Sequence, residues 1–116
     1  MKPVSKNNPL KHYEWGNHCS GWNLVEQNGL SIKQEHMPPG TLEEWHHHKI
    51  AQQFFYILKG YAVMEFEEIK MELKEGEGIY VEAGKKHRIV NMSDKGLEFL
   101  LVSQPSTLGD RIPDEE

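Results

Sequence analysis

Three consecutive histidines, His46, His47 and His48, are the residues whose types and spacing point most directly to chemistry. On a strand, successive side chains point to opposite faces, so His46 and His48 would share one face and His47 would take the other. Two residues along a strand separate the Cα atoms by about 6.6–6.8 Å, a gap that two imidazoles can close around one metal ion. A solvated loop would also accommodate the run, which is too short and too internal for a purification tag. The triplet alone does not decide between a pair of metal ligands on a strand and a solvated loop.

Glycines frame the histidines at defined distances. From Gly40, five residues precede His46, one residue separates it from His48, four precede Gln53, and six precede Gly60.

A second framed motif lies further along the chain. From Gly76, five residues precede Glu82, one precedes Gly84, two precede His87, and three precede Asn91. Together, in this order, the two motifs resemble the signature motifs of the cupin superfamily over about residues 30–104.

The cupin resemblance implies an all-β fold, a double-stranded β-helix or jelly-roll barrel, with one divalent transition metal inside. Carried onto this chain, the implied ligands are His46, His48, Gln53 and His87. The chain is then one cupin domain, residues 1–116, with short extensions at both ends. The metal is expected to be Zn, Ni, Fe, Mn or Co, because imidazoles suit several borderline ions.

Two residues depart from the family pattern. Glu82 stands where the family has a proline that shapes a turn. Gln53 stands where the family has an acid, and an amide oxygen coordinates without bringing charge. The full charge then stays on the metal, which predicts weaker binding, a more acidic bound water and attraction for anions. The alternative is that Gln53 only forms hydrogen bonds in a cupin that has lost its metal.

Short stretches rich in β-branched, aromatic and aliphatic residues alternate with Gly and Pro. They predict strands at 30–37, 52–60, 61–68, 69–75, 78–83, 87–93 and 97–104. The alternation in 69–75 is the cleanest. No window has a capped helical repeat, so long helices are not expected. Residues 1–12 and the segment 105–116 are polar and turn-rich, and both ends are expected either to fray or to cover a neighbouring element.

Composition narrows the class of protein. The net charge of −5 gives no electrostatic basis for binding nucleic acid or an anionic membrane. No apolar run reaches the length of a membrane span, and no signal-peptide core is present. One cysteine, Cys19, excludes an intrachain disulfide. A cytoplasmic protein is expected.

Alternation from Gln53 places Phe55 and Ile57 on the ligand face and Phe54, Tyr56 and Leu58 on the opposite face. In 97–104 it turns Phe99, Leu101 and Ser103 inward. His47 and Arg88 are expected to point away from the site, and Asn91 to hold a turn. The acid–base residue is unassigned, with His36 and Glu35 both open because parity does not say which of them faces inward.

An apolar outer face (Tyr56, Leu58, Leu100 and Val102) needs cover, and Trp15 and Trp22 would provide anchors. Cupins with one barrel are often dimers, so a homodimer is expected.

The favoured function is a metal-dependent enzyme acting on a small anionic sugar acid or keto acid by isomerisation, ring opening or a lyase reaction. The ligand set is similar to that of small cupins that open unsaturated uronates. The alternatives are a non-haem iron dioxygenase, a ligand-binding cupin without turnover, and a partner protein whose barrel is only a dimer scaffold.

Overall fold

The computed structural model describes residues 1–114, and these contain strands and turns but no helix. The expected all-β architecture is therefore confirmed. No helix in this part of the chain could cross a membrane.

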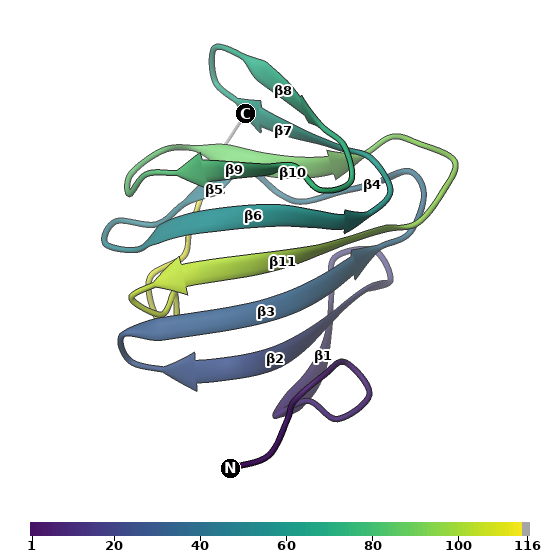
Figure 1. Ribbon diagram of the computed structural model, residues 1–116. Helices are drawn as coiled ribbons and strands as arrows, with labels where there is room; N and C mark the ends of the chain where they lie inside the picture. The colour runs from purple at the N-terminus through teal and green to yellow at the C-terminus, as the bar shows by residue number, and fades with distance from the viewer. Residues whose placement is uncertain (115–116) are drawn as a thin grey trace.

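Two sheets, each built from antiparallel pairs, face one another (Figure 1). The first has the order β1-β2-β3-β11-β6-β9: β1 Lys11–Trp15, β2 Cys19–Gln27, β3 Leu30–Met37, β6 Gln52–Lys59, β9 Gly78–Val81 and β11 Leu97–Gln104. The second has the order β12-β5-β10-β7-β8, with β4 also paired to β10: β4 Thr41–Leu42, β5 His46–His47, β7 Ala62–Phe66, β8 Lys70–Leu73, β10 His87–Asn91 and β12 Ile112–Pro113.

Each of the seven predicted strands forms within its expected range. β3 and β11 have the predicted bounds. Each of the other five is one to three residues shorter than its predicted range: β6, β7, β8, β9 and β10. Five strands were not expected as such. β1 and β2 extend the first sheet beyond β3. Two further strands, β4 and β5, are only two residues long, and β12 lies in the C-terminal segment.

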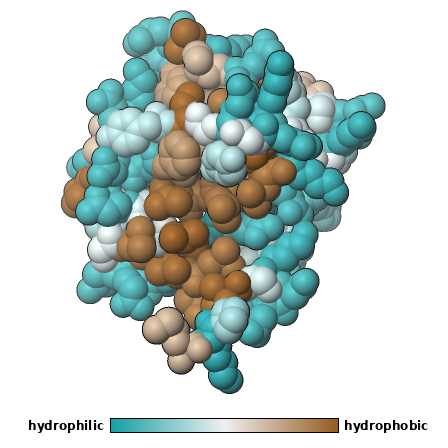
Figure 2. Space-filling view, in the orientation of Figure 1, coloured by the Kyte–Doolittle hydropathy of each residue, from teal (hydrophilic) through white to brown (hydrophobic). Residues whose placement is uncertain are grey.

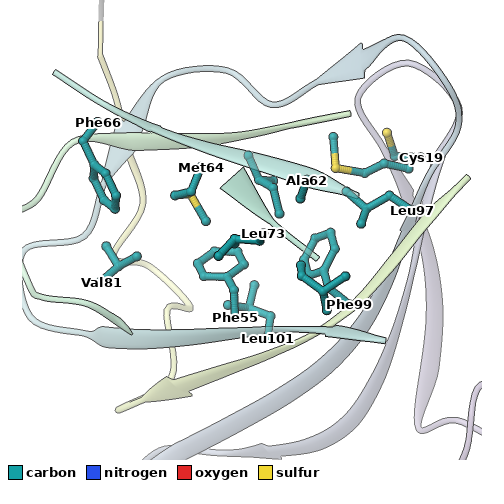
Figure 3. Close-up of a cluster of buried hydrophobic side chains, with 13 residues drawn as sticks. Cys19, Phe55, Ala62, Met64, Phe66, Leu73, Val81, Leu97, Phe99 and Leu101 are labelled. Carbon is teal, nitrogen blue, oxygen red and sulfur yellow. The ribbon is translucent and has the colours of Figure 1, made fainter. Parts of the chain in front are cut away.

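The core lies between the sheets and follows the period-two pattern of the strands. In β6, Phe55 and Ile57 are buried, whereas Phe54 is 41% exposed. Figure 3 shows Phe55, Phe99 and Leu101 of the first sheet meeting side chains of the second sheet in the interior. The inward and outward faces predicted for these strands are confirmed.

β8 departs from the packing that its pattern suggests. Its apolar alternation is clean, yet Met71 and the preceding Ile69 are exposed and only Leu73 is buried. β8 is the edge strand of the second sheet, and three of its four residues are exposed. Alternation therefore identified the strand but did not decide how much of it is covered.

The outer face of the first sheet carries a band of hydrophobic residues across β6 and β11 (Figure 2). Phe54, Tyr56 and Leu58 contribute to it and are each more than one third exposed. Trp22 stacks on His12, at 5.6 Å between ring centroids. Trp15, which was expected to be an outer anchor, instead packs against the core.

Candidate metal centre

His46, His48 and His87 come together in the interior of the protein. The register of β5 and β10 pairs His46 directly with His87, and His48 follows β5 with its side chain on the same face as that of His46. One ring nitrogen from each histidine lies within 4.8 Å of the others. The ring centroids are 4.4 Å apart for His46 and His87, and 5.0 Å apart for His46 and His48. All three side chains are buried.

Backbone carbonyls orient all three imidazoles. The Nδ1 atoms lie 3.0 Å from the carbonyl oxygen of Glu44 for His46, 2.7 Å from that of Asp110 for His48, and 2.8 Å from that of Lys85 for His87. A carbonyl oxygen only accepts hydrogen bonds, so each Nδ1 carries the proton. Each Nε2 therefore keeps a free lone pair, the arrangement typical of metal-binding histidines.

Gln53 directs its amide oxygen in the same way. Its Nε2 donates to Oγ of Ser103 at 3.0 Å, which leaves Oε1 as the free acceptor. Within residues 1–114, Oε1 of Gln53 and Nε2 of His48 and His87 are buried without a hydrogen-bond partner. Burying unpaired acceptors is costly, and a cation bound among them would remove that cost. The donor set therefore fits a divalent transition metal.

The electrostatics keep the imidazoles neutral. Burial is the main cause that lowers the pKa of His46 to about 3, and the repulsion that a second proton on His87 would bring acts in the same direction. Burial likewise lowers the pKa of His87 to about 4, and it lowers the pKa of His48. Neutral imidazoles are the form that binds metals, so the site is in its ligating state at neutral pH.

A pocket of about 630 Å³ opens beside the histidines. Its lining includes His46, His48 and Gln53, together with side chains from several other elements: Tyr13 and Trp15 of β1, Lys33 and Glu35 of β3, Phe55 of β6, Leu101 of β11, Glu43, and Arg111. The lining thus combines apolar walls with both acids and cations.

Of the two open acid–base candidates, Glu35 faces this pocket and His36 does not. Glu35 is 8% exposed and lies on the inward side of β3. Nδ1 of His36 lies 3.5 Å from Oε1 of Glu98 on the outer face. Adjacent residues of a strand point to opposite faces, and the register decides which of the two faces inward. It pairs Glu35 with the buried Phe99 and His36 with Glu98.

The remaining predicted residues lie where the sequence placed them. His47 points away from the site and binds Oδ2 of Asp114 through Nδ1 at 2.8 Å. Nε of Arg88 donates to Glu65, and its guanidinium lies over the ring of Trp45. Nδ2 of Asn91 donates to the carbonyl oxygens of Met37 and Lys95, so it holds a turn as expected.

The C-terminal segment contributes to the site rather than fraying. Carboxylate oxygens of Asp110 accept the backbone N–H groups of Lys49, Ile50 and Ala51 at 2.9–3.0 Å. β12 pairs with β5, and Arg111 reaches the pocket. The expectation that the C-terminal segment covers a neighbouring element is thus confirmed for residues 105–114. Residues 115 and 116 lie outside the described part of the chain.

Sequence reasoning missed Tyr13, Asp110 and Arg111. Tyr13 and Arg111 line the pocket, and Asp110 holds His48. These residues come from opposite ends of the chain and arrive there only through strand pairing and loop closure. Local periodicity carries no signal of such contacts.

Residues 33–103 match the family model described as the cupin domain. The chain is 31% identical over 83 residues to an uncharacterized protein, MJ1618, of Methanocaldococcus jannaschii, covering 72% of this chain and 66% of that protein. It is 32% identical over 66 residues to the Oxalate-binding protein of Thermotoga maritima, covering 57% of this chain and 54% of that protein. The matches span less than two thirds of both relatives.

A solved structure from Klebsiella pneumoniae, of an uncharacterized conserved protein with a double-stranded β-helix domain, has the same fold. Its TM-score is 0.73 with 22% identity, and the match covers 81% of this chain and 83% of that chain. At this identity, the likeness shows the fold alone.

Proposed function

The chain belongs to the cupin domain family, and from this premise we propose that it is a metal-dependent enzyme for small anionic molecules, such as a sugar acid or a keto acid. The reaction class proposed is isomerisation, ring opening or lyase chemistry. The observation that supports the proposal most directly is the set of buried, unpartnered acceptors on His48, His87 and Gln53. One ring nitrogen from each of His46, His48 and His87 lies within 4.8 Å of the others, and Gln53 lines the same pocket as His46 and His48.

The proposed ligands are Nε2 of His46, His48 and His87 and Oε1 of Gln53. A divalent metal held by them would polarise a carbonyl or carboxylate oxygen and stabilise negative charge there. The chain's own residues supply the remainder: they orient the imidazoles and give the pocket its shape and charge.

The charge of the pocket supports an anionic substrate. All four proposed ligands are neutral, so they would leave the charge of a bound cation uncompensated. Lys33 and Arg111 add cationic groups to the lining, where Arg111 also pairs with Glu44 at 2.7 Å. Burial, followed by the charge of Glu35, raises the pKa of Glu43 to about 8, so that this acid holds its proton at neutral pH. An anion with two oxygen atoms could therefore bind the metal through one oxygen and a cationic side chain of the lining through the other.

Metal analysis followed by turnover assays tests the proposal. Protein purified without added metal salts is analysed for bound transition metals, and the loaded protein is then assayed with uronates and keto acids. About one metal per chain and turnover of at least one of these compounds are expected. If the protein binds stoichiometric metal but turns over none of these compounds, the proposed metal site stands and the proposed enzymatic activity is rejected.

A second candidate is small-anion binding without turnover, favoured by the relative named Oxalate-binding protein. Oxalate carries two carboxylates, and the cationic groups of this pocket suit such a ligand. Calorimetric titration with oxalate, followed by measurement of the oxalate remaining, separates the two functions. Saturable binding with full recovery of oxalate, and no turnover of sugar or keto acids, supports the binding protein.

A further inference from the structure

Tyr13 and Glu35 form a hydrogen-bonded pair that the metal site does not use. Oη of Tyr13 donates to Oε2 of Glu35 at 2.5 Å, and both side chains line the pocket that His46 and His48 also line. The two residues lie on strands that are not neighbours, because β2 runs between β1 and β3.

Gly21 on β2 makes the contact possible. The register pairs Tyr13 with Gly21 and Gly21 with Glu35, so the three residues form one row across the sheet. A Cβ at position 21 would lie 2.1 Å from Cζ of Tyr13, which no side chain allows. The tyrosine ring therefore passes over the glycine to reach the carboxylate, and the pair is built into the sheet.

One oxygen of Glu35 remains available to a molecule in the pocket. Among the residues that the structure describes, only Tyr13 donates a hydrogen bond to this carboxylate, and it does so to Oε2. Oε1 is left without a donor on a side chain that lines the pocket. Two other acids of the lining are already engaged. Oε1 of Glu43 accepts the backbone N–H of Ile89 at 3.2 Å, and its Oε2 lies 3.9 Å from Nη2 of Arg111. Oε1 of Glu44 accepts a hydrogen bond from Nη1 of Arg111 at 2.7 Å.

We propose that Glu35 is the catalytic acid–base residue of this pocket and that Tyr13 is its positioning residue. The assignment rests on the proposed function. Oε1 of Glu35 takes a proton from a substrate carbon beside a carbonyl or carboxylate group. The electron pair of the broken C–H bond becomes a carbon–carbon double bond as the carbonyl pair moves to oxygen. In a substrate with a hydroxyl group on that carbon, the hydroxyl proton passes to the former carbonyl oxygen and the hydroxyl oxygen becomes the new carbonyl. Oε1 returns its proton to the former carbonyl carbon, so the step balances without a co-reactant.

The surroundings of Glu35 set its proton affinity. Burial raises the pKa of Glu35, and the hydrogen bond from Tyr13 together with the charges of Lys33 and Arg111 opposes this rise. Glu43 and Cys19 also face Glu35. Burial and the charge of Glu35 raise the pKa of Tyr13 far above its ordinary value, so Tyr13 keeps its proton and remains a donor.

Hydrogen exchange into a probe molecule tests the assignment. Metal-loaded protein is incubated in D₂O with pyruvate and, separately, with D-galacturonate, and loss of the C–H signal beside the carbonyl or carboxylate is followed by proton NMR. We expect Glu35→Gln to lower the wild-type exchange rate about 100-fold or more while its metal content stays unchanged. Glu14→Gln removes an exposed carboxylate from the same strand as Tyr13 and should exchange at the wild-type rate.

Tyr13→Phe separates positioning from general stability. Loss of the donated hydrogen bond raises the pKa of Glu35, so the acid limb of the exchange profile should move to higher pH. In metal-free protein, carbon-13 NMR of the Glu35 carboxyl should report the same direction of shift. If the pKa of the Glu35 carboxyl is the same in Tyr13→Phe and in wild type, Tyr13 is not a positioning residue for Glu35.

The outcomes distinguish this assignment from the proposed function. If wild-type and Glu35→Gln proteins exchange a probe equally, then the assignment to Glu35 is wrong and the enzyme proposal stands. If metal-loaded wild-type protein exchanges neither probe, the enzyme proposal fails, and the role of Glu35 fails with it.

Discussion

The backbone carbonyl of Asp110 accepts the Nδ1 hydrogen of His48 at 2.7 Å, across 62 residues of sequence. The same residue uses its carboxylate to bind three consecutive backbone N–H groups just after His48. Asp110 thus holds both the imidazole and the loop that carries it, so the C-terminal segment orients a proposed metal ligand.

We expect Asp110→Ala to weaken metal binding about 10-fold, because a ligand's orienting partner contributes to affinity at this scale. The carbonyl survives the substitution, but the loop that it is tied to loses its carboxylate anchor. Competition titration with a chelating dye measures the affinity. Asp94→Ala, at an exposed position, is the matched control, and equal affinities for the two variants would contradict the orienting role.

Removing two proposed ligands should empty the site. His46→Ala combined with His48→Ala is expected to abolish stoichiometric metal binding, as measured by elemental analysis after gel filtration. His47→Ala removes the neighbouring imidazole that points to Asp114 and should keep the wild-type metal content. Undiminished metal in a folded double variant would reject the ligand set.

Replacing the proposed amide ligand with a carboxylate should change affinity and turnover in opposite directions. Gln53→Glu adds a negative charge beside the cation, so the protein should retain its metal at higher chelator concentrations. The same charge reduces the Lewis acidity of the metal, so turnover of the best substrate should fall. Dialysis against a graded chelator series and steady-state kinetics check both directions. A variant that matches wild type in both measurements would show that Gln53 is not a ligand.

Acid should release the metal only at low pH. Protons compete with the metal for Nε2, and this competition begins as the pH approaches the pKa of each imidazole. Burial lowers the pKa of His46 to about 3 and that of His87 to about 4 in the metal-free fold. Metal content should therefore be constant from pH 7 to 5 and fall toward pH 4. Far-UV circular dichroism on the same samples monitors folding, and release near pH 6 from a folded protein would mean that the imidazoles are not buried as described.

A homodimer remains a prediction, and the outer face of the first sheet is its expected interface. The band in Figure 2 includes Phe54, Tyr56 and Leu58, and an exposed apolar surface of this kind favours association. Light scattering should give twice the chain mass. Tyr56→Lys should yield monomer, whereas Leu108→Lys, at an exposed leucine outside this sheet, should not. A wild-type mass equal to one chain overturns the prediction.

The sequence by itself determined the all-β fold and the identities of the candidate ligands. Period-two alternation specifies which side chains of β6 and β11 face inward, because successive residues of a strand must point to opposite sides. The framed motifs named His46, His48, Gln53 and His87, and the fold brings the three histidines to one point. These signals are local or carried by fixed spacing, so they can be read without coordinates.

Only the tertiary structure decided what surrounds the proposed ligands. The choice between Glu35 and His36 depended on which face of β3 meets the core, and alternation is the same for either face. Tyr13 reaches Glu35 because the register aligns both with Gly21 across three strands. Asp110 reaches His48 because the C-terminal segment folds back along β5. Such contacts arise from long-range pairing, and their free energy appears only when distant parts of the chain are packed together.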